Sequence, residues 1–172
     1  MIDMTLHHLG YVVRDLEEAA RRWYDLAGVG PFLVLDHVHF DTLTVDGRPA
    51  TFDHSAAFAA HGDVFLEIQR VHDANPAAAA AFFRAGEAPA LHHLAYVADD
   101  PAVTAAHLRD RGIPQTVTAS TAGLSIAQYD VRASLGFAVE IHPRTDEFVA
   151  LFAKVRAAAD GWDRSAFLRP FG

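Results

Sequence analysis

The sequence predicts an α+β fold built from two similar modules, and three observations lead to this prediction. The phrase LHHLGYVV at residues 6–13 returns as LHHLAYVA at residues 91–98. Each phrase is followed by apolar residues at helical spacing and then by several short strand-like segments. Each half ends in a related strand phrase, FLEIQ at 65–69 and AVEIH at 138–142. Such a repeat indicates two copies of one unit with the order β-α-β-β-β.

The first module is expected over residues 4–72. After its opening strand, Asp15 is a good helix N-cap with Glu18 three residues later, and Gly28 would end the helix. Three strands should follow, with the turn VDGR between the first two, at roughly residues 31–46, 50–60 and 63–71.

A helical connector is expected over residues 73–88, with Asn75 as its cap and Pro76 at its first position. The second module should then occupy residues 89–143. Its helix would be capped by Asp100. Its later strands are expected at roughly residues 115–120, 124–132 and 136–142.

The tail at 144–172 predicts an amphipathic helix that is capped by Asp146 and closed by Gly161. No low-complexity linker separates the two halves. We therefore expect residues 1–172 to form a single domain, a cupped mixed sheet with a C-terminal helix.

The composition excludes several classes of function. The net charge of −8 argues against a nucleic-acid or anionic-membrane partner, because both need clustered positive charge. The chain has no cysteine, which excludes disulfides, thiolate zinc sites and a cysteine nucleophile. We find no signal peptide and no apolar run long enough to span a bilayer, so a cytoplasmic protein is expected. Eleven histidines are an unusually high number.

Strand alternation separates the two histidines of each repeated pair. Alternate side chains of a strand share a face, so His8 lies with the small Gly10 and His93 with the small Ala95. Small neighbours leave room for a ligand. His7 and His92 would point to the opposite, bulkier face, where we interpret them as structural residues.

Two glutamates occupy matching positions in the closing strand of each module. Glu67 and Glu140 interrupt apolar runs, and a carboxylate there is costly to bury unless a positive group holds it. If the two sheets curve around one cavity, both glutamates could converge with His8 and His93. Two imidazoles and two carboxylates suit a divalent metal ion of borderline hardness.

These motifs resemble the vicinal oxygen chelate superfamily, which includes glyoxalase I, methylmalonyl-CoA epimerase, extradiol dioxygenases and bleomycin-resistance proteins. The resemblance covers about residues 4–143, and LHHLAYVADD is most similar to the epimerase and glyoxalase group. It implies a cupped sheet around a divalent metal ion (Zn, Ni, Co, Mn, Fe or Mg), and a homodimer. The residues that match the family's ligands are His8, Glu67, His93 and Glu140.

The four-ligand set favours proton abstraction next to a carbonyl of a small-molecule substrate. Four protein ligands on an octahedral ion leave two adjacent positions for substrate oxygens, and the ion would act as a Lewis acid. Glu140 and Glu67 are the candidate catalytic acid/base residues of an isomerase, epimerase or lyase. Two alternatives stay open: an Fe(II)-dependent dioxygenase, which typically uses two histidines and one carboxylate, and a metal-free protein that binds drugs.

The candidate substrate-binding residues come from the strands that carry the ligands. Strand alternation places Phe65 and Gln69 beside Glu67, and His142 beside Glu140. Tyr129 and His54 are further candidates from neighbouring strands. Phe32, Phe40 and Phe58 are candidates for an apolar wall.

One departure argues against true methylmalonyl-CoA epimerase activity. Those enzymes carry an additional glutamate on the third strand, and here that region reads ATFDHSAAF without one. Asp53 or His54 is the candidate replacement, and a one-residue shift in register decides which of them faces the cavity. Lys154 is the only lysine of the chain, so the phosphates of coenzyme A have no obvious anchor.

Overall fold

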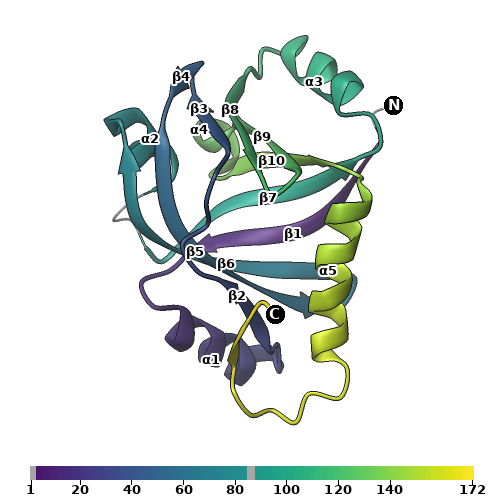
Figure 1. Cartoon of the computed structure of the whole chain (residues 1–172). Coiled ribbons are helices and arrows are strands. Elements are labelled where there is room, and N and C mark those ends of the chain that lie inside the picture. Colours follow the sequence, from purple (N-terminus) through teal and green to yellow (C-terminus); the bar gives the residue numbers. More distant parts are fainter. Residues whose placement is uncertain (1–2, 85–87) are drawn as a thin grey trace.

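The computed structural model describes residues 3–84 and 88–172, and it confirms the predicted α+β class. The described strands form one mixed sheet that curves around a central cavity (Figure 1). The strands are β1 Met4–Val12, β2 Phe32–Leu35, β3 Thr42–Val45, β4 Arg48–Pro49, β5 Thr51–His61, β6 Val64–Asn75, β7 Ala90–Ala98, β8 Gln115–Thr121, β9 Leu124–Asp130, β10 Ala138–Pro143 and β11 Leu168–Pro170. The helices are α1 Leu16–Ala27, α2 Ala77–Phe82, α3 Pro101–Arg109, α4 Arg132–Leu135 and α5 Asp146–Ala159.

The two modules have the same strand order and meet at their first strands. The full order is β11-β2-β5-β6-β1-β7-β10-β9-β8-β3-β4, so β1-β6-β5-β2 mirrors β7-β10-β9-β8. In both modules the first strand runs parallel to the fourth, and β1 pairs with β7 in the antiparallel sense. The predicted pair of β-α-β-β-β units is therefore present, with the two repeated phrases side by side at the centre of the sheet.

The predicted strand at 31–46 is wrong as a single element. The structure divides it into β2, which pairs with β5, and β3, which pairs with β8 of the other module. The division falls in the polar segment after Leu35, where His37 has a positive φ of 48°. The hairpin β3–β4 thus extends the edge of the second module, and the predicted VDGR turn lies at its tip, with Gly47 at a φ of 71°. Strand β11 was not predicted.

The capping residues set the helix boundaries largely as predicted. The Asp15 carboxylate accepts from the backbone N–H of Glu18 at 2.8 Å, and Gly28 ends α1 in the left-handed region. Asp100 accepts from two backbone N–H groups at the start of α3. The cap of α5 is Thr145, one residue before the predicted Asp146, and the helix ends before Asp160 rather than at Gly161.

The connector differs more from its prediction. Asn75 ends β6 instead of capping a helix, and Pro76 is the N-cap of α2. Helix α2 is therefore shorter than the expected segment, of which residues 85–87 lie outside the described residues. A short helix, α4, replaces the predicted turn ASLG. The limits proposed for the single domain and its modules are not tested by these elements and stay a prediction.

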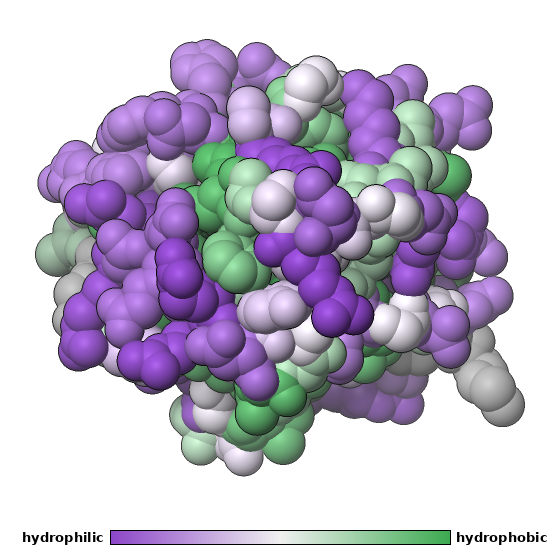
Figure 2. All heavy atoms as spheres, turned by 90° about the horizontal axis from the view of Figure 1, so that it is seen from below, coloured by the Kyte–Doolittle hydropathy of each residue, from purple (hydrophilic) through white to green (hydrophobic). Residues whose placement is uncertain are grey.

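The helices cover the sheet on both sides. Apolar residues of α1 pack on the first module and those of α3 on the second, around cores that contain Leu66 and Ile141, respectively. Helices α2 and α5 instead pack on either side of the cavity, through Phe82 and Phe152. The face seen from below is mostly hydrophilic, with smaller apolar patches (Figure 2). None of the described helices is long and apolar enough to cross a membrane.

Candidate metal centre

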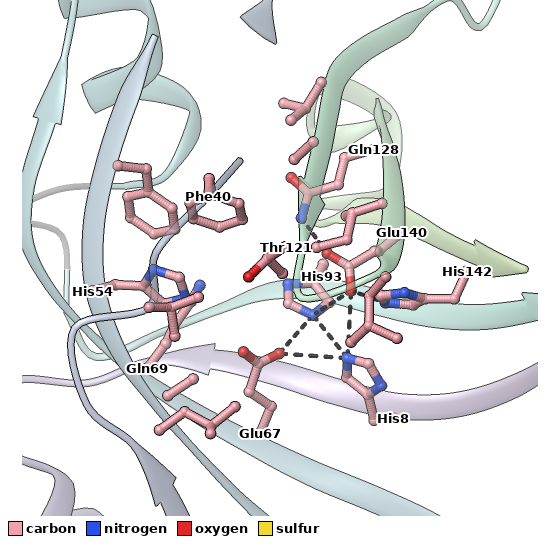
Figure 3. A pocket seen from close by; sticks show the side chains of 18 of the residues that line it. His8, Phe40, His54, Glu67, Gln69, His93, Thr121, Gln128, Glu140 and His142 are labelled. Carbon is pink, nitrogen blue, oxygen red and sulfur yellow. Dashed lines mark hydrogen bonds and ion pairs between the residues drawn. The ribbon is translucent and has the colours of Figure 1, made fainter. Parts of the chain in front are cut away.

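The four residues of the predicted ligand set meet at the centre of the curved sheet (Figure 3). His8 and His93 come from the paired strands β1 and β7, and Glu67 and Glu140 from the parallel neighbours of those strands. All four are buried, with exposed fractions of 2–6%. Gly10 lies opposite His93, and a β-carbon at this position would overlap the imidazole of His93. The small residue noted in the sequence is therefore required by the site itself.

The donor atoms converge closely. The Nε2 atoms of His8 and His93 lie 3.3 Å apart. The Glu67 carboxylate lies 3.4 Å from the first and 3.0 Å from the second. The corresponding distances for Glu140 are 3.5 and 3.7 Å. Donor atoms of His8, His93 and Glu140 all lie within 4.8 Å of one another, which suits three ligands of one divalent ion. Glu67 falls outside this group of three, but it lies close to both imidazoles and is the fourth candidate ligand.

The histidine before each candidate ligand contacts that ligand, which corrects the prediction for His7 and His92. The register between β1 and β7 shifts at two places, and these two residues are left without a partner on the other strand. Each is the extra residue of a β-bulge, where strict alternation of faces fails. The Nδ1 atoms of His7 and His8 lie 2.9 Å apart, as do those of His92 and His93.

The surroundings of His92 determine the tautomer of His93. Burial, with help from the nearby His93, lowers the pKa of His92 to about 3, so His92 is neutral. Its Nε2 lies 3.1 Å from the carbonyl oxygen of Phe82 and must donate there, because a carbonyl only accepts. Its Nδ1 therefore accepts the proton of His93 Nδ1. With the proton of His93 on Nδ1, its Nε2 keeps a lone pair, which is directed at the other three candidate ligands.

His8 carries a proton in the metal-free protein. Burial opposes its charge, but hydrogen bonds and ion pairs with Glu140 and Glu67 outweigh this and raise the pKa of His8 to about 9. Burial raises the pKa of both carboxyl groups, but the surrounding imidazoles outweigh it and keep each pKa below its usual range: His8 and His93 for Glu67, and His93, His142 and His8 for Glu140. A metal ion would displace this proton, because a ligating imidazole must offer a lone pair.

The two glutamates have different neighbours. Glu140 accepts hydrogen bonds from Gln128 Nε2 and from His142 Nε2, the second at 2.6 Å. Among the described residues, the Glu67 carboxylate lies nearest to the Nε2 atoms of the two imidazoles of the centre. One oxygen of Glu67 points toward the side of the cavity that holds Gln69 and His54 (Figure 3).

An apolar cavity of about 110 Å³ adjoins the four residues. Of the predicted substrate-binding residues, it is lined by His54, Gln69 and His142, and Phe40 and Phe58 contribute to its wall. Strand β5 turns His54 inward, and Asp53 pairs instead with His37 outside the cavity at 2.7 Å. Four buried polar atoms around the cavity have no hydrogen-bond partner among the described residues: His54 Nδ1, Gln69 Nε2, Gln128 Oε1 and His142 Nδ1.

The other predicted contacts are not brought to the cavity. Phe65 stacks on His7 at 4.9 Å and packs beside α5. Tyr129 is buried with Ile141 under α3, and Phe32 belongs to the core under α1. Strand alternation then places Gln128, the residue before Tyr129, in the cavity. We missed Gln128, although the opposite faces of β9 were the signal that could have found it.

A second group of possible ligands lies on the surface. Donor atoms of Asp36, His37 and His72 all lie within 4.8 Å of one another, but the three residues are exposed. The Ser55 hydroxyl links two of them: its oxygen lies 2.5 Å from Asp36 Oδ1 and 2.8 Å from His72 Nε2. This cluster must be controlled for when metal binding is measured.

Comparisons with known proteins agree with this architecture. A family model described as glyoxalase/bleomycin resistance protein/dioxygenase superfamily matches residues 7–128. The chain belongs to this superfamily. A search of curated proteins finds no significant match.

Two solved structures illustrate the shared fold. Methylmalonyl-CoA epimerase from Mycobacterium tuberculosis is 19% identical, with a TM-score of 0.55 over 84% of this chain and 91% of that one. A hypothetical protein from Bacillus halodurans is 13% identical, with a TM-score of 0.57 over 84% of this chain and 96% of that one. Identities this low show a shared fold, and they do not show a shared reaction.

Proposed function

We propose that this superfamily member is a divalent-metal-dependent enzyme that abstracts a proton next to a carbonyl group of a small molecule. The observation that carries the proposal is the convergence of two imidazole Nε2 atoms and two carboxylates beside an apolar cavity. His8, Glu67, His93 and Glu140 would hold the ion. When bound, the ion would supply Lewis acidity at a substrate carbonyl oxygen.

Glu67 is the better candidate for the general base. Gln128 and His142 hold both oxygens of Glu140, whereas one oxygen of Glu67 is directed into the cavity. Glu67 would accept the proton from the carbon beside the carbonyl while the C–H electron pair moves toward the carbonyl oxygen. In a substrate with a hydroxyl on that carbon, return of the proton to the former carbonyl carbon, together with transfer of the hydroxyl proton to the other oxygen, would complete an isomerisation with a single base at carbon.

Epimerisation would require a second base on the opposite face of the substrate. His54 is the candidate on the cavity wall, because burial lowers its pKa to about 4 and keeps the imidazole neutral. No carboxylate other than Glu67 and Glu140 lines the cavity among the described residues. We therefore favour isomerisation over epimerisation.

The two alternatives are less well supported by the site. A dioxygenase centre of two histidines and one carboxylate leaves three positions open, and here a fourth potential ligand lies within 3.4 Å of both imidazoles. A metal-free binding protein would gain nothing from burying two carboxylates. The homodimer and the cytoplasmic location stay predictions, and light scattering of the purified protein would check the first.

The proposal is tested by hydrogen–deuterium exchange at the carbon next to the carbonyl of 2-hydroxyacetophenone, followed by NMR. We expect exchange by protein loaded with one of Zn, Ni, Co, Mn, Fe(II) or Mg, and a loss of about 100-fold or more in Glu67→Gln. Glu147→Gln, which changes an exposed carboxylate on α5, should leave the rate unchanged. Oxygen uptake with Fe(II) and a catechol, without exchange for any of the six ions, would contradict the proposal and favour the dioxygenase.

A further inference from the structure

The charge balance of the cavity restricts the substrate. Its lining, among the described residues, contains no lysine or arginine, and its charged side chains are the carboxylates of Glu67 and Glu140. A divalent ion would balance these two negative charges and leave the centre neutral. A further negative charge on the substrate would then be buried without compensation, which is costly in an apolar cavity.

The size and the walls of the cavity restrict the substrate further. Its volume of about 110 Å³ is somewhat smaller than the ~150 Å³ of an engineered protein cavity that binds benzene. Aromatic rings form much of its wall, including Phe52, which stacks on Phe83 at 3.9 Å, and Phe58. A single ring can pack against such walls, whereas a long acyl chain or a nucleotide cannot be enclosed.

Two unpartnered polar groups lie across the cavity from the candidate metal centre. His54 Nδ1 and Gln69 Nε2 are buried, with residue exposures of 5% and 3%, and have no hydrogen-bond partner in the part of the chain that the structure describes. They come from the neighbouring strands β5 and β6, and both point into the space opposite His8 (Figure 3). Because leaving such groups unpaired costs ~1–3 kcal/mol each, a polar atom of the ligand is the natural partner.

We propose that the substrate is an uncharged, single-ring carbonyl compound with two adjacent oxygens at the metal end and a hydroxyl or carbonyl oxygen at the far end. Gln69 and His54 recognise the far oxygen and determine specificity. A carboxylate or a coenzyme A ester does not match the charge and size of this cavity. This inference rests on the proposed metal centre, and it does not depend on which reaction follows.

The charge preference is tested with two probes that differ in one group. The neutral 1-phenyl-1,2-propanedione and the anionic benzoylformate share a phenyl ring and adjacent oxygens. Calorimetric titration of the Zn-loaded protein should give a Kd at least tenfold lower for the neutral probe. Equal or tighter binding of benzoylformate would overturn the proposal, and this outcome is informative because a carboxylate alone binds zinc more strongly than a ketone does.

A gain-of-function variant makes the same test independent of any loss of folding. Leu124→Lys places a cation at the cavity wall, in a half-buried position. It should improve the Kd of benzoylformate, relative to that of the neutral probe, at least fivefold. No improvement in a variant that still binds zinc would contradict the argument from charge.

The role of the far end is tested by adding a hydroxyl group. The 3-hydroxyphenyl analogue of the neutral probe should bind the wild-type protein about tenfold more tightly than the parent compound. This advantage should disappear in Gln69→Met and persist in Gln115→Met, a matched change of an exposed glutamine on β8. An advantage that survives in Gln69→Met and His54→Leu would overturn the assignment.

Failure of this inference is distinguishable from failure of the proposed function. The titrations need only a bound ion, so they measure the preference for the neutral over the anionic probe even if no proton exchange is found. Conversely, rapid exchange with an anionic substrate would uphold the proposed function and overturn the substrate class.

Discussion

The two halves of the candidate metal centre are alike in their ligands and different in what holds those ligands. Glu67 and Glu140 occupy equivalent places on β6 and β10. The residue opposite Glu140 on the neighbouring strand is Gln128, whereas the residue opposite Glu67 is Phe58. Two residues further along, His142 bonds to Glu140, while the amide nitrogen of Gln69 has no hydrogen-bond partner within residues 3–84 and 88–172.

This difference assigns separate tasks to the two modules. The second module holds its carboxylate rigidly through two hydrogen bonds, which suits a permanent metal ligand. The first module leaves its carboxylate and its neighbouring amide directed at the cavity, which suits contact with a substrate. The repeat therefore preserves the ligand positions while the surroundings specialise.

Among the substitutions compared, removal of one imidazole should reduce the affinity for the metal ion most, in either half of the centre. His93→Ala deletes a donor atom and should weaken binding of Zn by more than 100-fold, because the loss of a direct ligand exceeds the 10–100-fold typical of its supporting partners. Competition with a chromogenic chelator would measure the affinity. His61→Ala, at an exposed position on β5, should leave it unchanged. If His93→Ala bound zinc with unchanged affinity, His93 would not be a ligand of the ion.

The supports of the two glutamates provide the next comparison. Gln128→Met removes a hydrogen bond to Glu140 and should weaken metal binding 10–100-fold. Gln69→Met, the corresponding change near Glu67, should alter it less than threefold, because Gln69 does not bond to the carboxylate. The same chelator competition applies. Equal effects of the two changes would show that the modules are not specialised in this way.

Substitution of the two small residues beside the histidines should destabilise the protein to different degrees. Gly10→Ala adds a methyl group that would overlap the ring of His93, so we expect a loss of about 1–3 kcal/mol in the free energy of unfolding and weaker metal binding. Ala95→Gly should cost about 1 kcal/mol or less through backbone entropy. Urea denaturation measures both. A fully stable Gly10→Ala protein with normal metal affinity would contradict the close approach.

The proton on His8 predicts how the stability of the metal-free protein depends on pH. The folded pKa of about 9 lies above the ordinary value of 6.5. The stabilisation is therefore complete below pH 6.5 and is lost as pH rises through 9, by about 1 kcal/mol per pH unit. Urea denaturation between pH 6.5 and 9 should show this decline. Metal-loaded protein should not show this decline, because His8 then carries no such proton. The same decline in both forms would mean that the proton on His8 is not its cause.

Acid should destabilise the metal-free protein for a different reason. Burial depresses the pKa of His7, His54 and His92 to about 3, 4 and 3, so the unfolded chain binds more protons than the folded one below pH 6.5. Stability should fall from pH 6.5 toward pH 4, and maximum stability should lie near pH 6.5. His92→Phe should reduce the acid slope if the protein still folds, and an unchanged slope would mean that His92 does not contribute.

Much of the fold and of the candidate centre could be predicted because repetition makes weak signals stronger. One histidine in a strand says little, but His8 and His93 at equivalent positions, with Glu67 and Glu140 at the ends of the modules, indicated a shared site. Caps such as Asp15 were visible because capping depends on neighbours in sequence.

The features that escaped prediction depend on long-range pairing. Strict alternation placed His7 and His92 on the wrong face because a β-bulge is decided between strands and not within one. The pairing of β3 with β8 crosses from one module to the other, and no local pattern records it. Alternation along β9 could have placed Gln128 in the cavity, but only the register of β9 with β10 sets it opposite Glu140.

The most direct test of the account is a crystal structure of the protein loaded with zinc, with anomalous diffraction recorded at the zinc edge. We predict one strong peak per chain, bonded at about 2.0–2.2 Å to the Nε2 atoms of His8 and His93 and to carboxylate oxygens of Glu67 and Glu140. His37→Ala protein, which lacks the surface cluster, should give the same peak. A zinc ion found only at Asp36, His37 and His72, with none between His8 and His93, would contradict the central claim.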